Sequence, residues 1–227
     1  DLENLPSSNQ IYKKLLRENS YTIKGEIRWR SLGLPRPQWQ NSWQNLAPPI
    51  HQEKLWKTKH FILHQSDRID SQKNTISPKR KCSFCVQSKV IPAPDDTHLH
   101  ALSLCPQAKE TWDKLHYIIR KINYAALPSR KQDWIIGIKG GNKKSLLLNT
   151  LISSTLHILW TSRNEQAKED KITPPRVIAK KIISSFKRSI FYWYQIAKRN
   201  NTLENFKIHV QIPEICTINQ DRIELHI

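Results

Sequence analysis

The chain has 227 residues, of which 38% are hydrophobic and eight are tryptophan, so it can fill the core of one large domain or two small ones. Its formal net charge is +18, which is typical of proteins that bind a polyanion, nucleic acid first and an anionic membrane surface second. No apolar run is long enough to span a bilayer, and the polar N-terminus DLENLPSSNQ does not resemble a secretory signal. We therefore expect a protein of the cytoplasm and/or nucleus, without a membrane partner. Because it contains no methionine, we expect it to be a piece of a longer protein.

The first 75 residues are predicted to be helical and rich in tryptophan. Apolar residues recur at helical spacing in residues 8–19, in a short stretch that carries Trp39, Trp43 and Leu46, and in residues 51–65. Pro48 and Pro49 are expected to end the second of these helices. Tryptophans beside arginines can stack on nucleobases, but this spacing favours core packing.

The central motif joins three of the four cysteines to two histidines. Cys82 and Cys85 form a Cys-x-x-Cys pair, and His98, His100 and Cys105 follow after a polar loop. Two thiolates on a tight turn, a third thiolate and one imidazole make a closed tetrahedral Zn²⁺ site. The spacing of His100 from Cys105 favours His100 as the third ligand, and His98 is then expected at the surface or beside the ligands. In the reducing compartment expected here, cysteines are more typical of metal ligands than of disulfides.

Basic residues lie on both sides of this motif. Lys79, Arg80 and Lys81 precede the first cysteine, where they can contact phosphate or remain solvated. After the last cysteine, an amphipathic helix is predicted from Pro106, with these residues toward the core: Trp112, Leu115, Ile118, Ile119 and Ile122.

Two long helices are predicted next. The first starts at Lys143 and turns Leu147, Leu151, Thr155, Leu159 and Trp160 toward the core. Near its end, Arg163 is expected either to contact a phosphate or to bond a neighbouring carbonyl. The second has Thr173 as its N-cap and runs to Asn201, with no acid to interrupt it. Its basic face is the main candidate for contacts with a phosphate backbone, through Arg176, Lys180, Lys181, Lys187 and Arg188.

The C-terminal residues change their period. Phe206, Ile208, Val210 and Ile212 alternate with polar residues, and so do Ile223, Leu225 and Ile227. Alternation predicts two strands of a β-hairpin, joined by a connection in which Cys216 is an ordinary thiol.

The fold class expected from these patterns is mainly α, a helical domain with a CCHC zinc-binding loop and a small C-terminal β-hairpin. The chain divides into a Trp-rich helical segment 1–75, a zinc-binding segment with its following helix 76–125, a long helical pair with a basic face 126–203 and the hairpin 204–227. No catalytic centre is predicted. Asp67, Asp70, Asp95 and Asp96 lie in polar loops rather than in strands that would bring them together on Mg²⁺, and a closed Zn²⁺ site has no open position.

The Cys-x-x-Cys pair, followed by HALSLCPQAKETW, resembles the zinc-binding region downstream of the reverse transcriptase in non-LTR (LINE-type) retrotransposons. The segment LLNTLISSTLHILWTSRNEQ is similar to a helix of the same family that carries a Trp-x-x-Arg-Asn signature, and the resemblance covers roughly residues 35–200. It implies His100 as the third ligand, a structural zinc, and an accessory role in binding RNA or target DNA beside other domains of the same polyprotein. The alternative is a zinc-stabilised protein-interaction or scaffolding domain without nucleic-acid binding. A divergent nuclease that uses Asp95 or Asp96 is a third.

Overall fold

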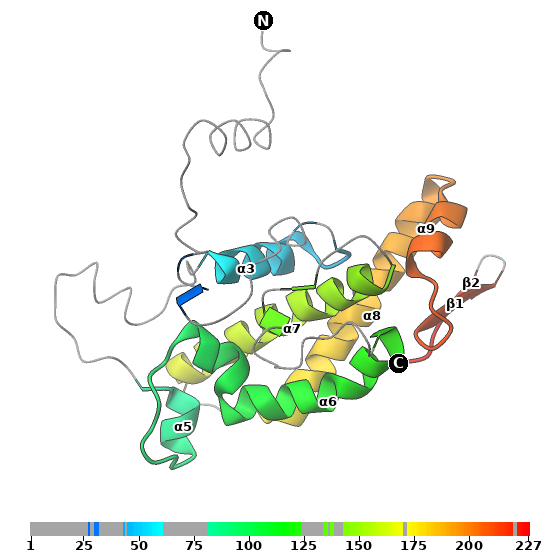
Figure 1. Ribbon diagram of the computed structural model, residues 1–227. Coiled ribbons are helices and arrows are strands. Elements are labelled where there is room, and N and C mark those ends of the chain that lie inside the picture. The colour runs from blue at the N-terminus through cyan, green and yellow to red at the C-terminus, as the bar shows by residue number, and fades with distance from the viewer. Residues whose placement is uncertain are drawn as a thin grey trace, which may run out of the picture. The chain divides into compact units, whose positions relative to one another are not determined.

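Figure 1 shows the computed structural model of the chain. It describes residues 27, 30–31, 43, 45–60, 81–123, 134–135, 137–138, 143–169, 172–219 and 222–227. The chain forms two compact units, Asp1–Arg36 and Pro37–Ile227. In the first unit only three exposed helical residues are described, so the predicted helix 8–19 lies outside the described residues. All elements discussed below belong to the second unit. None of the described helices is long and apolar enough to cross a membrane.

The second unit is mainly helical and ends in a two-stranded antiparallel hairpin, as the sequence predicts. Its described elements are α3 (Pro49–Lys59), α5 (Ser83–Gln87), the π-helix η3 (His100–Leu104), α6 (Pro106–Asn123), α7 (Lys143–Glu169), α8 (Pro175–Arg199), α9 (Leu203–Val210), β1 (Cys216–Asn219) and β2 (Arg222–Leu225). The four segments proposed from the sequence stay predictions.

Helix α7 is the centre of this unit. Residues 147–156 are all buried, which requires neighbours on every side of the helix. Those neighbours are α3, α6, α8 and α9, together with the short helices α5 and η3 (Figure 1). The predicted inward faces are confirmed for both α6 and α7. All five predicted residues of α6 are at most 2% exposed, and the five of α7 are at most 3% exposed.

The prolines at the start of α3 correct one prediction. Trp43 lies in a turn and residues 45–47 lie in bends, so no helix ends at Pro48. Instead Pro48 is the N-cap of α3 and Pro49 is its first residue. Proline suits the first helical position because its fixed φ is already helical and its missing N–H has no partner there anyway. Trp39 and residues 61–65 lie outside the described part of the chain.

Helix α8 differs from its prediction at both ends. Its N-cap is Pro174 with Pro175 at the first position, one residue later than expected. It ends at Arg199, two residues early, because Asn201 takes a left-handed φ of 55° that asparagine tolerates well. Of the predicted apolar face, the following residues are buried: Ile178, Ala179, Ile182, Phe186 and Ile190. Trp193, also predicted inward, is 37% exposed.

The first predicted strand is wrong. Phe206, Ile208 and Val210 lie in helix α9, which packs on α7 and α8 and buries Val210 while Ile208 is 70% exposed. Ile212 lies beyond the helix, in an isolated bridge with Cys216. The strand that pairs with β2 comes from the predicted connection, and it places Cys216 opposite Leu225. Cys216 is a buried free thiol that donates to the carbonyl of Val210 at 3.4 Å.

Candidate metal centre

The first pair of cysteines lies at the start of a helix. Cys82 is the N-cap of α5 and Cys85 is its third residue. The chain before α5 is fixed to the loop that follows it: the amide of Cys82 donates to the carbonyl of Pro94 at 3.0 Å, and Lys81 forms an ion pair with Asp95 at 2.7 Å. The α5 turn thereby presents both thiols on the same side.

The second pair of predicted ligands is joined by a π turn. The amide of Cys105 donates to the carbonyl of His100 at 2.7 Å, an i to i+5 hydrogen bond. Five residues of α-helix would rotate the chain by about 500° and leave its ends about 140° apart. The wider π turn places residues i and i+5 on the same side. It is held by Trp112, whose indole N–H donates to the carbonyl of Leu102 at 2.9 Å, and by Ser103, which donates to the carbonyl of Leu99 at 2.7 Å.

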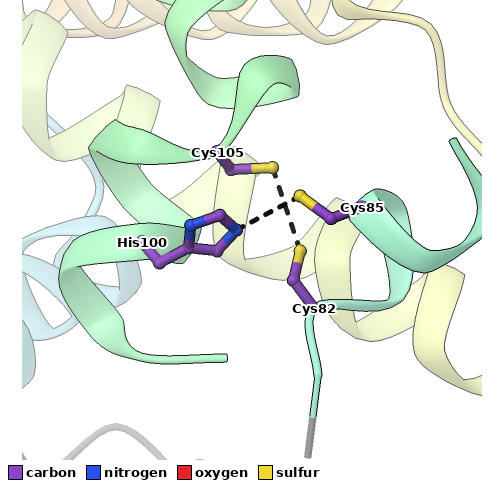
Figure 2. Close-up of side chains that lie close together, drawn as sticks. All are labelled: Cys82, Cys85, His100 and Cys105. Carbon is purple, nitrogen blue, oxygen red and sulfur yellow. Dashed lines mark hydrogen bonds between the residues drawn. The ribbon is translucent and has the colours of Figure 1, made fainter. Parts of the chain in front are cut away.

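The four side chains converge on one point (Figure 2). The ligand atoms of Cys82, Cys85, His100 and Cys105 all lie within 4.8 Å of one another. The sulfurs of Cys82 and Cys105 are 3.9 Å apart, and the sulfur of Cys85 is 3.4 Å from Nε2 of His100. Zn–S bonds of about 2.3 Å and Zn–N bonds of about 2.05 Å in a tetrahedron require edges of about 3.8 Å and 3.6 Å. The two measured separations therefore match the edges of such a tetrahedron, and the four donors lie close enough together to share one ion.

The thiols show the electrostatics of a site built for a cation. The hydrogen bond with Cys105 lowers the pKa of Cys82 to about 3, and the backbone N–H of Cys85 contributes to that lowering. Burial raises the pKa of Cys85 to about 11. The hydrogen bond with Cys82, followed by burial, raises the pKa of Cys105. Three buried thiolates in contact repel one another, and a divalent ion between them removes that repulsion.

The cluster is closed to solvent. Cys82, Cys85 and Cys105 are at most 3% exposed, and His100 is 7% exposed. Two helix N-termini meet here, because Cys105 directly precedes the first residue of α6. Thiolates are stabilised at such ends by the backbone N–H groups and the helix dipole. Four protein donors complete a tetrahedral shell, so the group suits an ion that holds structure together.

His98 is neither at the surface nor part of the cluster. It is 4% exposed, and its ring stacks on Trp160 of α7 with the centroids 5.9 Å apart. The prediction that His98 lies at the surface is therefore wrong, because its side chain packs in the core. The interval between the two histidines explains the difference, because a change of two residues along a helical turn moves a side chain to another face.

The loop between the two pairs is anchored by an ion pair that the sequence did not suggest. Arg163 of α7 forms a two-fold contact with Asp96: its Nε donates to Oδ1 at 2.8 Å, and its Nη2 pairs with Oδ2. Both side chains are largely buried, at 14% and 8% exposure. The guanidinium also lies 4.6 Å above the ring centroid of Trp160. The guanidinium also donates to the side-chain carbonyl oxygen of Asn164 at 3.0 Å, so Arg163 bonds a neighbouring carbonyl oxygen as one of its two predictions states, while the phosphate contact stays a prediction. Asp96 and Arg163 are 67 residues apart, so no local pattern could reveal their ion pair.

The predicted nucleic-acid contacts lie in two places. Lys79 and Arg80 are outside the described residues, and Lys81 is paired with Asp95. The residues of α8 lie on its outer face: Arg176, Lys180, Lys181 and Arg188 are exposed and Lys187 is half-buried. None of these five forms an ion pair with a described acidic residue, and α8 itself contains no acid. The structure thus brings the predicted metal ligands together, while the α8 cations form a separate stripe.

No family model, no curated protein and no solved structure matches this chain.

Proposed function

We propose that this chain is a zinc-stabilised nucleic-acid-binding domain of a LINE-type retrotransposon polyprotein, which assists the binding of RNA or target DNA during target-primed reverse transcription. The observation that carries the proposal is the outer face of α8, where cations follow one another over 25 residues without an acid. The family assignment rests on the order of the short motifs around Cys82, Cys85, His100 and Cys105.

Zinc is the metal that this donor set favours. Three thiolates and one imidazole in a tetrahedron suit Zn²⁺, whereas Mg²⁺ and Ca²⁺ prefer oxygen ligands. Cys82 and Cys85 would hold the ion from α5, and His100 and Cys105 would hold it from the π turn. When bound, the ion neutralises the thiolates and ties the two segments together. The chain's own contribution is to aim the four donors and exclude water from them.

Phosphate contacts supply most of the affinity of a basic surface for nucleic acid, because each neutralised phosphate releases a counterion. Helices that only face solvent usually carry acids among their bases for i,i+4 support, and α8 carries none. The net charge of +18 adds to the attraction at longer range.

The domain is proposed as a binding module rather than an enzyme. Asp95 and Asp96 were the carboxylates that a nuclease would use, and both are engaged: Asp95 pairs with Lys81, and Asp96 pairs with Arg163. Two carboxylates held by cations on different elements are poorly placed to share Mg²⁺. The polymerase activity implied by the resemblance would belong to another domain of the polyprotein.

A protein-interaction domain is the second candidate, and a specific observation favours it. Consecutive aromatic residues on α8 are exposed: Phe191 at 49%, Tyr192 at 61% and Trp193 at 37%. Exposed aromatic side chains are enriched in protein interfaces.

A titration separates the two candidates. Fluorescence anisotropy of labelled single-stranded RNA and duplex DNA would be measured with zinc-loaded protein between about 50 and 200 mM salt. The proposal predicts tight binding at low salt that weakens steeply as salt rises. An absence of binding to both nucleic acids at the lowest salt would exclude it and leave the interaction domain. Metal analysis of the same protein should give about one Zn²⁺ per chain.

A further inference from the structure

An open groove of about 510 Å³ lies where α3, α7 and α8 meet. Its lining includes His51 from α3, His157 from α7, and five residues of α8, among them Lys180, Lys181, Ser184 and Arg188. Ser184 follows Lys180 by four residues and Lys181 by three, and Arg188 follows Ser184 by four, so these residues form one strip along the helix. The groove is therefore a place where the basic face of α8 borders a cavity.

Two stacked histidines line the groove. The rings of His51 and His157 lie 4.1 Å apart between centroids, with 24° between their planes. Nδ1 of His51 is 3.3 Å from the hydroxyl of Ser154. Nδ1 of His157 is buried and has no hydrogen-bond partner within the described structure. A buried polar atom without a partner costs about 1–3 kcal/mol, which marks a place where the packing is not arranged for stability alone.

The charges around the groove are all of one sign. Lys180, Lys181 and Arg188 line it, and no acidic residue does. The histidines respond to this field. Burial, then His157 and Arg188, lower the pKa of His51 to about 4, and burial followed by Lys54 lowers the pKa of His157. Both rings are consequently neutral at pH 7, and each can donate one N–H to an anion.

We infer that this groove receives a backbone phosphate of a bound nucleic-acid strand. The lysines and the guanidinium of Arg188 neutralise the phosphate, and Ser184 supplies a hydroxyl donor. The identity of the ligand rests on the proposed function, to which the inference adds the point on α8 where the strand is held.

The second large cavity offers a contrast. It measures about 520 Å³ and lies between α7, α8 and α9, where Phe206, Val210 and Ile196 contribute apolar walls. Among its lining residues Lys143 is the one permanent cation. A phosphate would lose its hydration there without comparable compensation. The chemistry that suits an anion is therefore found in the first groove.

The test compares two arginines of one helix. Arg188 lines the groove, whereas Arg199 is also exposed on α8 but is not among the lining residues. Arg188→Gln and Arg199→Gln each remove one positive charge. The loss of nucleic-acid affinity that both variants share therefore measures the general electrostatic attraction of α8. We expect Arg188→Gln to weaken RNA or DNA binding about tenfold and Arg199→Gln less than about threefold, with each salt slope changing by at most about one.

A second measurement follows the histidines directly. In NMR titrations of the whole chain with inorganic phosphate, the ring signals of His51 and His157 should move in the wild type and stay still in Arg188→Gln. The bound anion should also raise the pKa of both rings, because its negative charge favours the protonated imidazole.

The outcomes are separable. Equal losses in the two variants would overturn the groove as the phosphate site and leave the proposed function intact. If the wild type binds no nucleic acid at low salt, the proposed function fails and a strand is excluded as the occupant. The phosphate titration then decides the remaining chemistry: moving histidine signals support an anion site, and unmoved signals reject it.

Discussion

Removing either member of the ion pair between Asp96 and Arg163 should destabilise the fold by several kcal/mol. Removing one member of a buried pair costs about 3–5 kcal/mol, because the other charge is left uncompensated. Asp96→Ala should lower the free energy of unfolding by about 3 kcal/mol, because Arg163 keeps its stacking on Trp160 and its hydrogen bond to Asn164 at 3.0 Å. Arg163→Met should reach about 4–5 kcal/mol, because it loses the cation–π contact as well.

The assay is urea unfolding at pH 7 with zinc present in excess. With m of about 3 kcal/mol/M, a loss of 4 kcal/mol lowers the midpoint by more than about 1 M. The double variant Asp96→Leu/Arg163→Met replaces both charges with apolar groups and should recover most of the loss, which gives a large coupling energy in a double-mutant cycle.

The matched control is Glu110→Gln, which removes an exposed i,i+4 pair with Lys114 on α6 and should give no measurable change. If both single variants at Asp96 and Arg163 lose less than about 1 kcal/mol, the pair behaves like a surface salt bridge. In that case the loop from Cys85 to His100 is held by something else.

Three further predictions concern the metal centre and the core. His100→Ala should release the bound zinc while His98→Ala retains it, as measured by metal analysis after dialysis; the reverse result would exchange their roles. Burial lowers the pKa of Lys59 to about 7, below its value in the unfolded chain. Between about pH 7 and 10.4 the unfolded chain therefore binds more protons than the folded chain, and the free energy of unfolding should rise with pH across that window. Lys59→Met should therefore stabilise the protein at pH 6–7 and much less near pH 10, and a pH-independent gain in urea unfolding would contradict this. Trp112→Phe should cost about 1–3 kcal/mol by leaving the carbonyl of Leu102 without its donor, and unchanged stability in calorimetry would argue against that bond.

The helices with strong apolar periodicity could be predicted from the sequence. The inward residues of α6 and α7, such as Trp112 and Leu151, recur mostly at intervals of three and four residues, and all of them are buried in the core. The four residues of the cluster could likewise be chosen, because thiols and imidazoles at this close spacing are typical of metal sites.

The C-terminal segment shows where local patterns fail. Phe206 and Val210 fit strand alternation, but with Leu203 they also fit the helical spacing of three and four. Contacts with α7 and α8 decide in favour of the helix, and such contacts are not local. The strand β1 was missed because its residues, Cys216–Asn219, lie in the stretch EICTINQDR, whose polar residues are typical of a turn.

The groove beside α8 and the ion pair between Asp96 and Arg163 were not predictable for the same reason. His51 and His157 are more than one hundred residues apart in the sequence, and neither belongs to a recognisable motif in its own helix. Only the packing of α3 on α7 brings the two rings together. Sequence patterns indicated the face of α8 that carries charge, but not the point where that face borders a cavity.

The π turn between His100 and Cys105 also determines which changes of chain length the metal centre tolerates. A π turn contains one residue more than an α turn. Deleting one of residues 101–104 would set the two ligands at i and i+4, which an ordinary α-helix already places side by side. Inserting one would set them at i and i+6, about 120° apart around the helix. Over evolutionary time the spacing of this ligand pair is therefore expected to shorten by one residue without loss of the metal, but not to lengthen.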